Sequence, residues 1–335
     1  MSRKPTLTDI ARDAGASLAT VSRALAQPEL VRPDTRARIE EAATRLGYVP
    51  NRKARALASG QSHTIGVVVP TLNSPIFSAC LQEMQRRFAS QGYNLLIASH
   101  EYDTGAETAA VTQLLSHGVD GMILVGAERP QVTWALLESA AIPLVQMWEG
   151  IDAHDCIRID NHAAGRIIAH HLLELGHRHF GIICGRLRNN DRQSARLAGI
   201  RAALGAAGLE LARAQISEQP LSIAAGRSGC TTLLELVPRP TAIIGTADLL
   251  AIGAMIEAQA RGLRVPGALS VGGIDNVDVA AHLAPSLTTV DIPAADIGAE
   301  AAEVMLQRLG GVELQRPERS ALPIALVTRH STAAP

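Results

Sequence analysis

Short apolar runs alternate with amphipathic segments from His63 onward, and this alternation constrains the fold more than any other feature. The runs are TIGVVVP (64–70), NLLIAS (94–99), GMILVG (121–126), PLVQMW (143–148), HFGIIC (179–184), AIIGT (242–246) and ALSVGGI (268–274). Helical patterns lie between or before them at 75–90, 107–117, 132–141, 162–175, 191–207, 226–236 and 248–261. Repeated βα units predict parallel sheets with helices on both faces, here as two α/β subdomains with a cleft between them.

Composition limits the class of protein. The 335 residues suit two or three domains, and 47% are hydrophobic but only 2% aromatic, so aliphatic side chains must fill the core. No apolar run reaches the ~18 residues of a membrane span, and the N-terminus has no apolar signal core. The four cysteines are scattered without metal spacing, which predicts buried, reduced thiols. We expect a cytoplasmic protein.

The net charge of −1 is unevenly distributed. Residues 1–60 contain eleven Lys or Arg against six Asp or Glu, so this segment is basic and the remainder is acidic. A basic leading segment suits contact with phosphates, although a solvated tail would have the same composition.

The basic segment also contains a helix-turn-helix pattern. LTDIARDA (7–14) has apolar residues at helical spacing, and Gly15 is suited to end that helix. Ser17 is a good N-cap for a second helix, LATVSRALA (18–26). A third helix is expected from Pro33 to Leu46, stopped by Gly47. Two short helices joined by a Gly-containing turn make a helix-turn-helix, and the third completes a small core.

The run LTDIARDAGASLATVSRAL, followed by TRARIEEAATRLGYVPNRKARALASGQS, resembles the headpiece of the LacI family of bacterial transcription regulators without a gap. DNHAAGRIIAHHLLELGHRHFGIICG, SARLAGIRAAL, TADLLAIGA and LSVGGIDNV resemble that family's effector domain, which has the periplasmic-binding-protein fold. The resemblance implies three chain crossings, near residues 160, 291 and 321. The expected domains are a helix-turn-helix at 1–50, a hinge helix and linker at 51–61, and an effector-binding and dimerisation domain at 62–335. That domain would comprise an N-subdomain of 62–160 with 291–320 and a C-subdomain of 161–290 with 321–335.

The resemblance places the second helix in the DNA major groove. Leu18 and Ala19 match the residues that choose bases, and Arg23 matches a third base contact; Arg pairs well with guanine. Leu18 and Ala19 have no donors, so they can offer only apolar contact, for example to a thymine methyl. A core position for Leu18, or a solvated or phosphate-bound Arg23, is the alternative. The family commonly has Ser or Thr where this chain has Arg32, so capping of the third helix should be weaker.

Other headpiece positions match phosphate contacts or the hinge. Phosphate contacts position the protein without specifying a sequence. The segment 51–59 matches a hinge helix that is too short to be stable alone, and Leu57 matches an apolar wedge that enters the minor groove. A plain linker is the alternative for Leu57. The expected DNA-binding residues are Thr8, Ser17, Leu18, Ala19, Thr20, Ser22, Arg23, Tyr48, Asn51, Arg52, Ala54 and Leu57.

The effector cleft should lie at the carboxyl ends of the parallel strands. By resemblance, Arg196 is the ligand-clamping Arg and Asp275 accepts hydrogen bonds from the ligand; a structural salt bridge is the alternative for both. Phe77 and Trp148 would provide an aromatic wall, or simply pack in the core. Asp248 could contact the ligand or only cap a helix. The expected effector-binding residues are Ser74, Phe77, Trp148, Arg196, Asp248 and Asp275.

Rival functions lack their motifs. A dehydrogenase would need a Gly-rich fingerprint after the first strand, where this chain has PTLNSP, and GxSxG, P-loop and HExxH motifs do not occur. We therefore predict no enzyme activity and no cofactor. His170, His171, His177 and His179 suit a helix end better than a metal site. An exported sugar-binding protein would need a signal sequence and no headpiece.

These observations predict a repressor that binds operator DNA and responds to a sugar or sugar acid. The chain ends VTRHSTAAP without a leucine heptad, which favours a homodimer over a coiled-coil tetramer. No membrane partner is expected.

Overall fold

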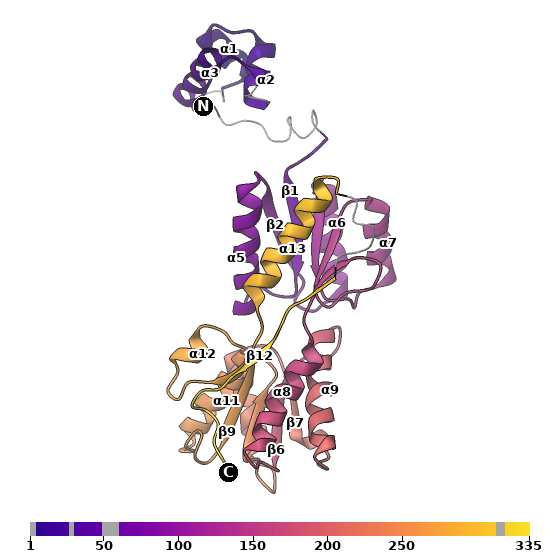
Figure 1. The fold of residues 1–335 in the computed structure, drawn as a ribbon, viewed down its shortest axis with the longest axis vertical. Coiled ribbons are helices and arrows are strands. Elements are labelled where there is room, and N and C mark those ends of the chain that lie inside the picture. The colour runs from indigo at the N-terminus through magenta and orange to yellow at the C-terminus, as the bar shows by residue number, and fades with distance from the viewer. Residues whose placement is uncertain (1–4, 27–29, 49–59, 313–318) are drawn as a thin grey trace. The chain divides into compact units, whose positions relative to one another are not determined.

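The computed structural model describes residues 5–26, 30–48, 60–312 and 319–335 (Figure 1). The chain divides into two compact units, Met1–His63 and Thr64–Pro335. We describe the first as the headpiece and the second as the body, each by itself.

The headpiece contains the three helices that the sequence predicts, with the same bounds: α1 (Leu7–Ala14), α2 (Leu18–Ala26) and α3 (Pro33–Leu46). Ile10, Val21 and Ile39 are fully buried and form the centre of its core. Gly15 and Gly47 end α1 and α3 in the left-handed conformation, at φ 60° and 64°. The side chain of Arg32 makes no cap hydrogen bond to α3, as expected.

The first sheet of the body is entirely parallel, with the order β11-β5-β4-β3-β1-β2. Its strands are β1 (Thr64–Val69), β2 (Asn94–Ser99), β3 (Gly121–Val125), β4 (Leu144–Trp148), β5 (Asp155–Arg158) and β11 (Arg319–Ala321). Helices α5 (Pro75–Ser90) and α13 (Ala294–Leu309) pack together, and α6 (Thr104–Ser116) packs with α7 (Gln131–Ala140). The two helix pairs bury separate hydrophobic clusters, so both faces of the sheet are covered.

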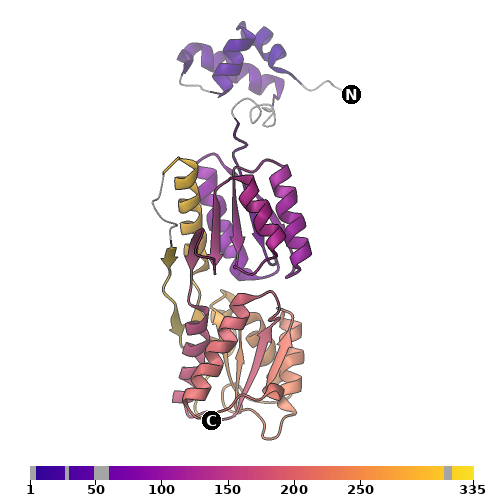
Figure 2. The same ribbon diagram turned by 90° about the vertical axis from the view of Figure 1, so that its right-hand side faces the viewer.

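The second sheet has the order β12-β10-β9-β8-β6-β7, parallel except for the edge strand β12. Its strands are β6 (Phe180–Gly185), β7 (Ile216–Gln219), β8 (Ala242–Gly245), β9 (Ser270–Asp275), β10 (Thr288–Asp291) and β12 (Ala325–Val327). Its helices are α8 (Asn161–Glu174), α9 (Asp191–Ala206), α10 (Ile223–Leu234), α11 (Asp248–Ala260) and α12 (Val279–His282). The pairs α8 with α9 and α10 with α11 lie on opposite sides of the sheet (Figure 2).

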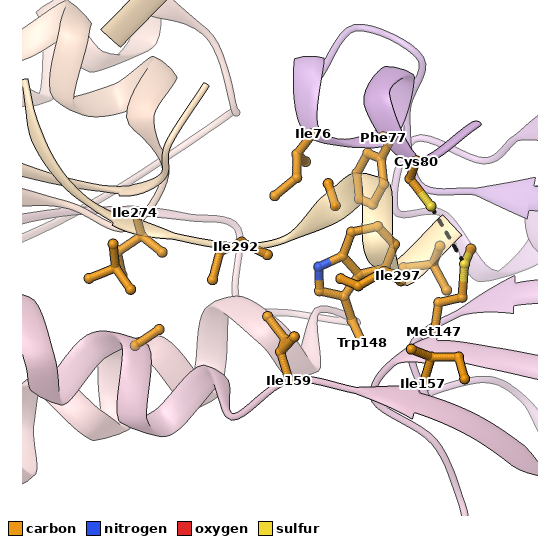
Figure 3. Close-up of a cluster of buried hydrophobic side chains, with 14 of the residues drawn as sticks. Ile76, Phe77, Cys80, Met147, Trp148, Ile157, Ile159, Ile274, Ile292 and Ile297 are labelled. Atoms are coloured by element: carbon orange, nitrogen blue, oxygen red, sulfur yellow. Dashed lines mark hydrogen bonds between the residues drawn. The ribbon is translucent and has the colours of Figure 1, made fainter. Parts of the chain in front are cut away.

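The two sheets are joined by three chain segments and by a shared core. The chain leaves the first sheet after β5, returns to its face with α13, and passes back between β11 and β12. One buried cluster spans both sheets: Figure 3 shows it running from Ile274 and Ile292 through Ile159 to Trp148. Shared apolar contacts at the crossings hold the two halves of the body together.

Several elements differ from the sequence expectations. The helix expected from residue 107 begins at Thr104, because Asp103 caps it by accepting a hydrogen bond from the Ala106 N–H at 2.7 Å. The helix expected from residue 226 begins at Ile223, with Ser222 as its cap. The sequence pattern did not indicate β5, β7, β10, β11, β12, α12 or α13. Within the described residues, no helix is long and apolar enough to cross a lipid bilayer.

Candidate functional site

Helix α2 has one buried and one exposed face. Val21 is fully buried and Ala24 is 6% exposed, whereas Leu18 is 51% exposed. Ala19, Ser22 and Arg23 are also exposed. This excludes Leu18 from the headpiece core and leaves its apolar side chain uncovered within this unit.

The other predicted DNA-binding residues differ in their exposure and in their hydrogen bonds. Thr8 is exposed, while Tyr48 is half-buried and packs against the headpiece core. Ser17 caps α2: its Oγ accepts a hydrogen bond from the Thr20 N–H at 3.1 Å and lies 2.8 Å from the Thr20 hydroxyl. Asn51, Arg52, Ala54 and Leu57 lie outside the described residues.

Five of the six predicted effector residues line one small cavity between the two halves of the body, which we call the inner cavity. They are Ser74, Phe77, Trp148, Arg196 and Asp275. The cavity has a volume of about 30 Å³, room for about one water molecule. Side chains therefore fill most of the space between the walls of the inner cavity, and a larger molecule requires these walls to separate.

Close packing of α8 against α9 positions Arg196. A Cβ on Gly165 would collide with the backbone carbonyl of Arg196, and a Cβ on Gly199 would collide with that of His162. Because both positions are glycine, the two helix backbones approach closely and bring Arg196 beside Asn161. The Arg196 Nε–H donates to Asn161 Oδ1 at 3.0 Å.

Arg196 makes a buried ion pair with Asp275. Its Nη1 donates to Asp275 Oδ1 at 2.8 Å and to the Thr246 carbonyl at 2.8 Å. The two residues are 3% and 8% exposed. Burial raises the pKa of Asp275 above its usual range, and the charge of Arg196 opposes this shift. Arg196 and Asp275 thus form a salt bridge and also line the inner cavity, so the two roles considered for them do not exclude each other.

The opposite wall is aromatic. The rings of Phe77 and Trp148 meet edge to face, with centroids 5.2 Å apart and planes 73° apart (Figure 3). They are 4% and 1% exposed, so both also belong to the core. Trp148 has φ 66°, a left-handed conformation that is unusual for an aromatic residue.

Asp248 is the predicted effector residue that does not line the inner cavity. It is fully buried, and it accepts hydrogen bonds from the Val277 N–H at 2.9 Å and the Thr289 hydroxyl at 2.6 Å. Nor is it the N-cap of α11, which is Ala247. The carboxylate instead links the start of α11 to the loop after β9 and to β10. Burial, with repulsion from Asp275, raises the pKa of Asp248 to about 7.

Sequence reasoning missed several residues of the inner cavity, among them Tyr102, Asn190, Arg192 and Gln193. Arg192 and Gln193 lie one turn before Arg196 on α9, so helical spacing could have found them. Tyr102 follows β2 in the other half of the body, and nothing in the local sequence indicates its position. Asn190 caps α9, and its Nδ2 is buried without a hydrogen-bond partner in the described part of the chain.

A hydrogen bond from the loop after β3 connects the two halves beside the inner cavity. The Ala127 N–H, in the loop after β3, donates to Asp191 Oδ2 at 2.7 Å. Asp191 begins α9 and also pairs with Arg192 at 2.8 Å. This hydrogen bond therefore holds the start of α9 against the half of the body that contains the first sheet.

Three of the four histidines considered as metal ligands have other partners. His170 Nδ1 lies 3.4 Å from Glu174 Oε1. His171 Nε2 lies 2.9 Å from the Thr332 hydroxyl. His177 lies 2.9 Å from both the Thr241 hydroxyl and the Ala333 carbonyl. The rings of His171 and His177 thus contact the C-terminal segment.

The two-half α/β body and its helix-turn-helix headpiece define a ligand-responsive DNA-binding protein, and comparison with known proteins specifies the family. Residues 6–51 match the family of bacterial regulatory proteins of the lacI type, and residues 169–332 match a periplasmic binding protein-like domain. The chain is 32% identical over 331 residues to the HTH-type transcriptional repressor CytR of Escherichia coli, covering 98% of this chain and 96% of that protein. The chain belongs to the LacI family, so it is a DNA-binding transcription regulator and not an enzyme.

Solved structures show the same architecture. The lac repressor dimer bound to operator and the anti-inducer ONPF matches with a TM-score of 0.85 and 28% identity, covering 99% of this chain and 100% of that chain. The complex of the transcriptional regulator CelR with cellobiose matches with a TM-score of 0.73 and 28% identity, covering 98% and 99%. Both matches include the headpiece as well as the body.

Proposed function

We propose that this regulator is a homodimeric repressor that a small sugar or sugar acid releases from its operator. The observation that carries the proposal is the inner cavity, which has an aromatic wall formed by Phe77 and Trp148 opposite the ion pair of Arg196 and Asp275. An aromatic face suits the apolar side of a sugar ring, and a guanidinium with a carboxylate suits its hydroxyls. The cellobiose complex of CelR supports a sugar as the ligand class.

The small volume of the inner cavity supports a switch. A ring that enters between the walls pushes the two halves apart and strains the hydrogen bond between Ala127 and Asp191. We propose that the halves are a subdomain of residues 62–160 with 291–320 and a subdomain of 161–290 with 321–335. A change in their angle would alter the spacing of the two hinge segments, 51–61, in a dimer. Effector and operator binding are then coupled reciprocally.

Two exposed surfaces support the proposals of DNA binding and of a dimer. The exposed Leu18, Ala19 and Arg23 face of α2 would enter the major groove, and the remaining predicted positions would contact phosphates or the minor groove. In the body, Leu96 and Ile97 of the edge strand β2 are 37% and 44% exposed. An apolar edge strand of this kind is a suitable dimer contact. The lac repressor structure is a dimer bound to operator, which agrees with this proposal.

Operator binding with and without sugars tests the proposal. An operator is first obtained by in vitro selection, and its binding is then followed by fluorescence anisotropy while sugars and sugar acids are titrated. We expect at least one compound to release the operator and, in the absence of DNA, to raise the melting temperature; ligand at ~100 times its Kd adds roughly 2.7 kcal/mol.

Two matched variants test whether the effector response depends on the inner cavity. Asp275→Asn removes the cavity carboxylate, whereas Asp278→Asn changes a carboxylate whose side chain is 99% exposed only three residues away. The first should weaken the response at a given effector concentration, and the second should leave it as in the parent. If both variants respond like the parent, the effector does not use Asp275 and the site must lie elsewhere.

A further inference from the structure

A second, larger space lies beside the inner cavity, and we call it the outer crevice. It has a volume of about 740 Å³. One wall is the loop after β2, including Glu101 and Tyr102, and the other contains Arg186 and Arg188 from the loop after β6. Tyr102 also lines the inner cavity, so the two spaces meet at this residue. The outer crevice is large enough for a substantial part of a small ligand.

Strained backbone gathers along both spaces. Glu101, Tyr102 and Asn189 line the outer crevice and have φ of 46°, 63° and 56°. Trp148 and Asp275 line the inner cavity and have φ of 66° and 131°. These five belong to a set of eight non-glycine residues with positive φ in the described ranges. Such conformations are costly and concentrate where a protein binds ligands, so their distribution indicates one continuous ligand site.

The charged groups of the outer crevice differ in whether they already have partners. Glu218 accepts a hydrogen bond from the Leu187 N–H at 3.1 Å, and Asp103 accepts one from the Ala106 N–H at 2.7 Å. Arg186 and Arg188 are exposed, and neither forms an ion pair or hydrogen bond with the residues that the structure describes. The arginines of the inner cavity, by contrast, both form ion pairs: Arg196 with Asp275 and Arg192 with Asp191.

Two unpartnered guanidinium groups that are separated in the sequence only by Leu187 suit a ligand anion. A guanidinium grips a carboxylate or a phosphate through two parallel hydrogen bonds, and two such groups on one loop strengthen the attraction. Glu101, on the opposite wall, is the carboxylate without a described partner. On the wall that leads into α9, the two guanidinium groups outnumber the single carboxylate, Glu218, so this wall carries a net positive charge.

We propose that the outer crevice binds the anionic group of the effector, a carboxylate or a phosphate, through Arg186 and Arg188. The sugar ring of the same molecule would lie between the walls of the inner cavity. This inference rests on the proposed function and narrows its ligand to sugar acids and sugar phosphates. A neutral sugar would leave both guanidinium groups of the crevice unused.

Matched pairs of compounds test the proposal on the full-length protein. Glucose with gluconate, galactose with galacturonate, and ribose with ribose phosphate each compare a neutral sugar with an anionic relative, and cellobiose serves as a neutral two-ring sugar. Affinities come from calorimetry and melting temperatures. We expect an anionic member to bind about tenfold or more tightly than its neutral relative, with an affinity that falls as salt is added. The carboxylate and phosphate pairs show which anion is preferred.

Variants assign the effect to the outer crevice. The double variant Arg186→Gln, Arg188→Gln should lose about tenfold or more in affinity for the anionic compound and little for its neutral relative. Arg186→Lys, Arg188→Lys keeps both charges but loses the paired hydrogen bonds, so it should retain only part of the preference. Arg239→Gln removes an exposed arginine from the loop before β8 and should bind as the parent does. Circular dichroism confirms folding of each variant.

The outcomes separate this inference from the function on which it rests. If a neutral sugar binds tightest and the double glutamine variant binds it unchanged, the anion site is overturned and the sugar-responsive repressor stands. If cellobiose binds tightest, the outer crevice holds a second sugar ring and the anion site is again overturned. If no compound of either kind binds or releases the operator, both proposals fail.

Discussion

Arg196 on α9 and Asp275 at the end of β9 form an ion pair with 2.8 Å between Nη1 and Oδ1, at positions only 3% and 8% exposed. The pair lies on the wall of the inner cavity, so the same two groups stabilise the body and face the proposed ligand. Removing one partner of a buried pair leaves the other charge without compensation, whereas removing both charges is much less harmful. The Arg196 side chain therefore cannot be truncated without affecting folding.

We predict that Arg196→Ala lowers the free energy of unfolding of the body by about 3–5 kcal/mol. Asp275→Asn should cost less, because the amide oxygen still accepts the hydrogen bond from Arg196. The double variant should be less destabilised than the sum of the two single variants, since no charge is left alone. Urea denaturation followed by circular dichroism measures all three. Simple additivity would show that the two groups do not depend on each other.

Strong local signals explain what the sequence predicts well. The headpiece helices have distinct ends, at Gly15 and Gly47, and the central strands are continuous apolar runs, so their positions follow from the pattern. Strands β5 (DCIR) and β7 (ISEQ) are four residues long and partly polar, and hydrogen bonds to neighbouring strands define them. Helix α13 is different, because Ile297, Ala301 and Met305 follow a helical spacing that should have indicated it.

The residues of the candidate site likewise differ in whether the sequence predicts them. Arg196 and Asp275 follow from resemblance to a family motif, and both reach the inner cavity. Tyr102 depends on how the loop after β2 meets the other half of the body, a tertiary relationship that no local pattern encodes. Asp248 shows the opposite error: its position after a strand indicated the ligand site, but the Val277 N–H and the Thr289 hydroxyl occupy its carboxylate.

The exposed face of α2 predicts separate effects for its apolar and charged residues. Arg23→Ala should weaken operator binding by roughly 1–3 kcal/mol for each base that the guanidinium recognises. Leu18 has no donor, so Leu18→Gln should change the preferred base at one symmetric pair of positions and leave the salt dependence nearly unaltered. Binding to a set of operator variants measures both. The assignment of Leu18 fails if its variant ranks the operators in the same order as the parent.

The family resemblance predicts a wedge at Leu57, which lies outside the described residues. An apolar side chain that opens a base step kinks the duplex, so Leu57→Ala should weaken operator binding and reduce bending. Effector affinity measured without DNA should stay the same. Energy transfer between dyes at the two ends of the operator reports the bend. A parental bend in the Ala variant would exclude a wedge at this position.

Asp248 predicts a pH dependence of stability with a definite sign. Its pKa is about 7 in the folded body, against a usual value of 3.8, because the carboxyl is fully buried and lies near Asp275. Thr289, Val277 and Arg196 oppose this shift without cancelling it. The folded state therefore holds a proton that the unfolded state releases at a lower pH. Its contribution to stability is full below the unfolded pKa and is lost as pH rises through about 7.

Asp248→Asn should remove this dependence, because an amide does not titrate in this range. The substitution has a cost of its own that does not change with pH, since the amide nitrogen cannot accept from either donor that binds the carboxylate, although the Thr289 hydroxyl can reverse its role. The difference in free energy of unfolding, variant minus parent, should thus shift in favour of the variant between about pH 5 and about pH 8. His100 has the opposite influence, because burial and the nearby Arg192 and Arg129 lower its pKa to about 4, but it is present in both proteins and cancels in the difference. Asp278→Asn, at a side chain that is 99% exposed, should show no such shift. A difference that stays constant across this range would mean that Asp248 is charged in the folded body throughout, held by Arg196 and its two hydrogen bonds.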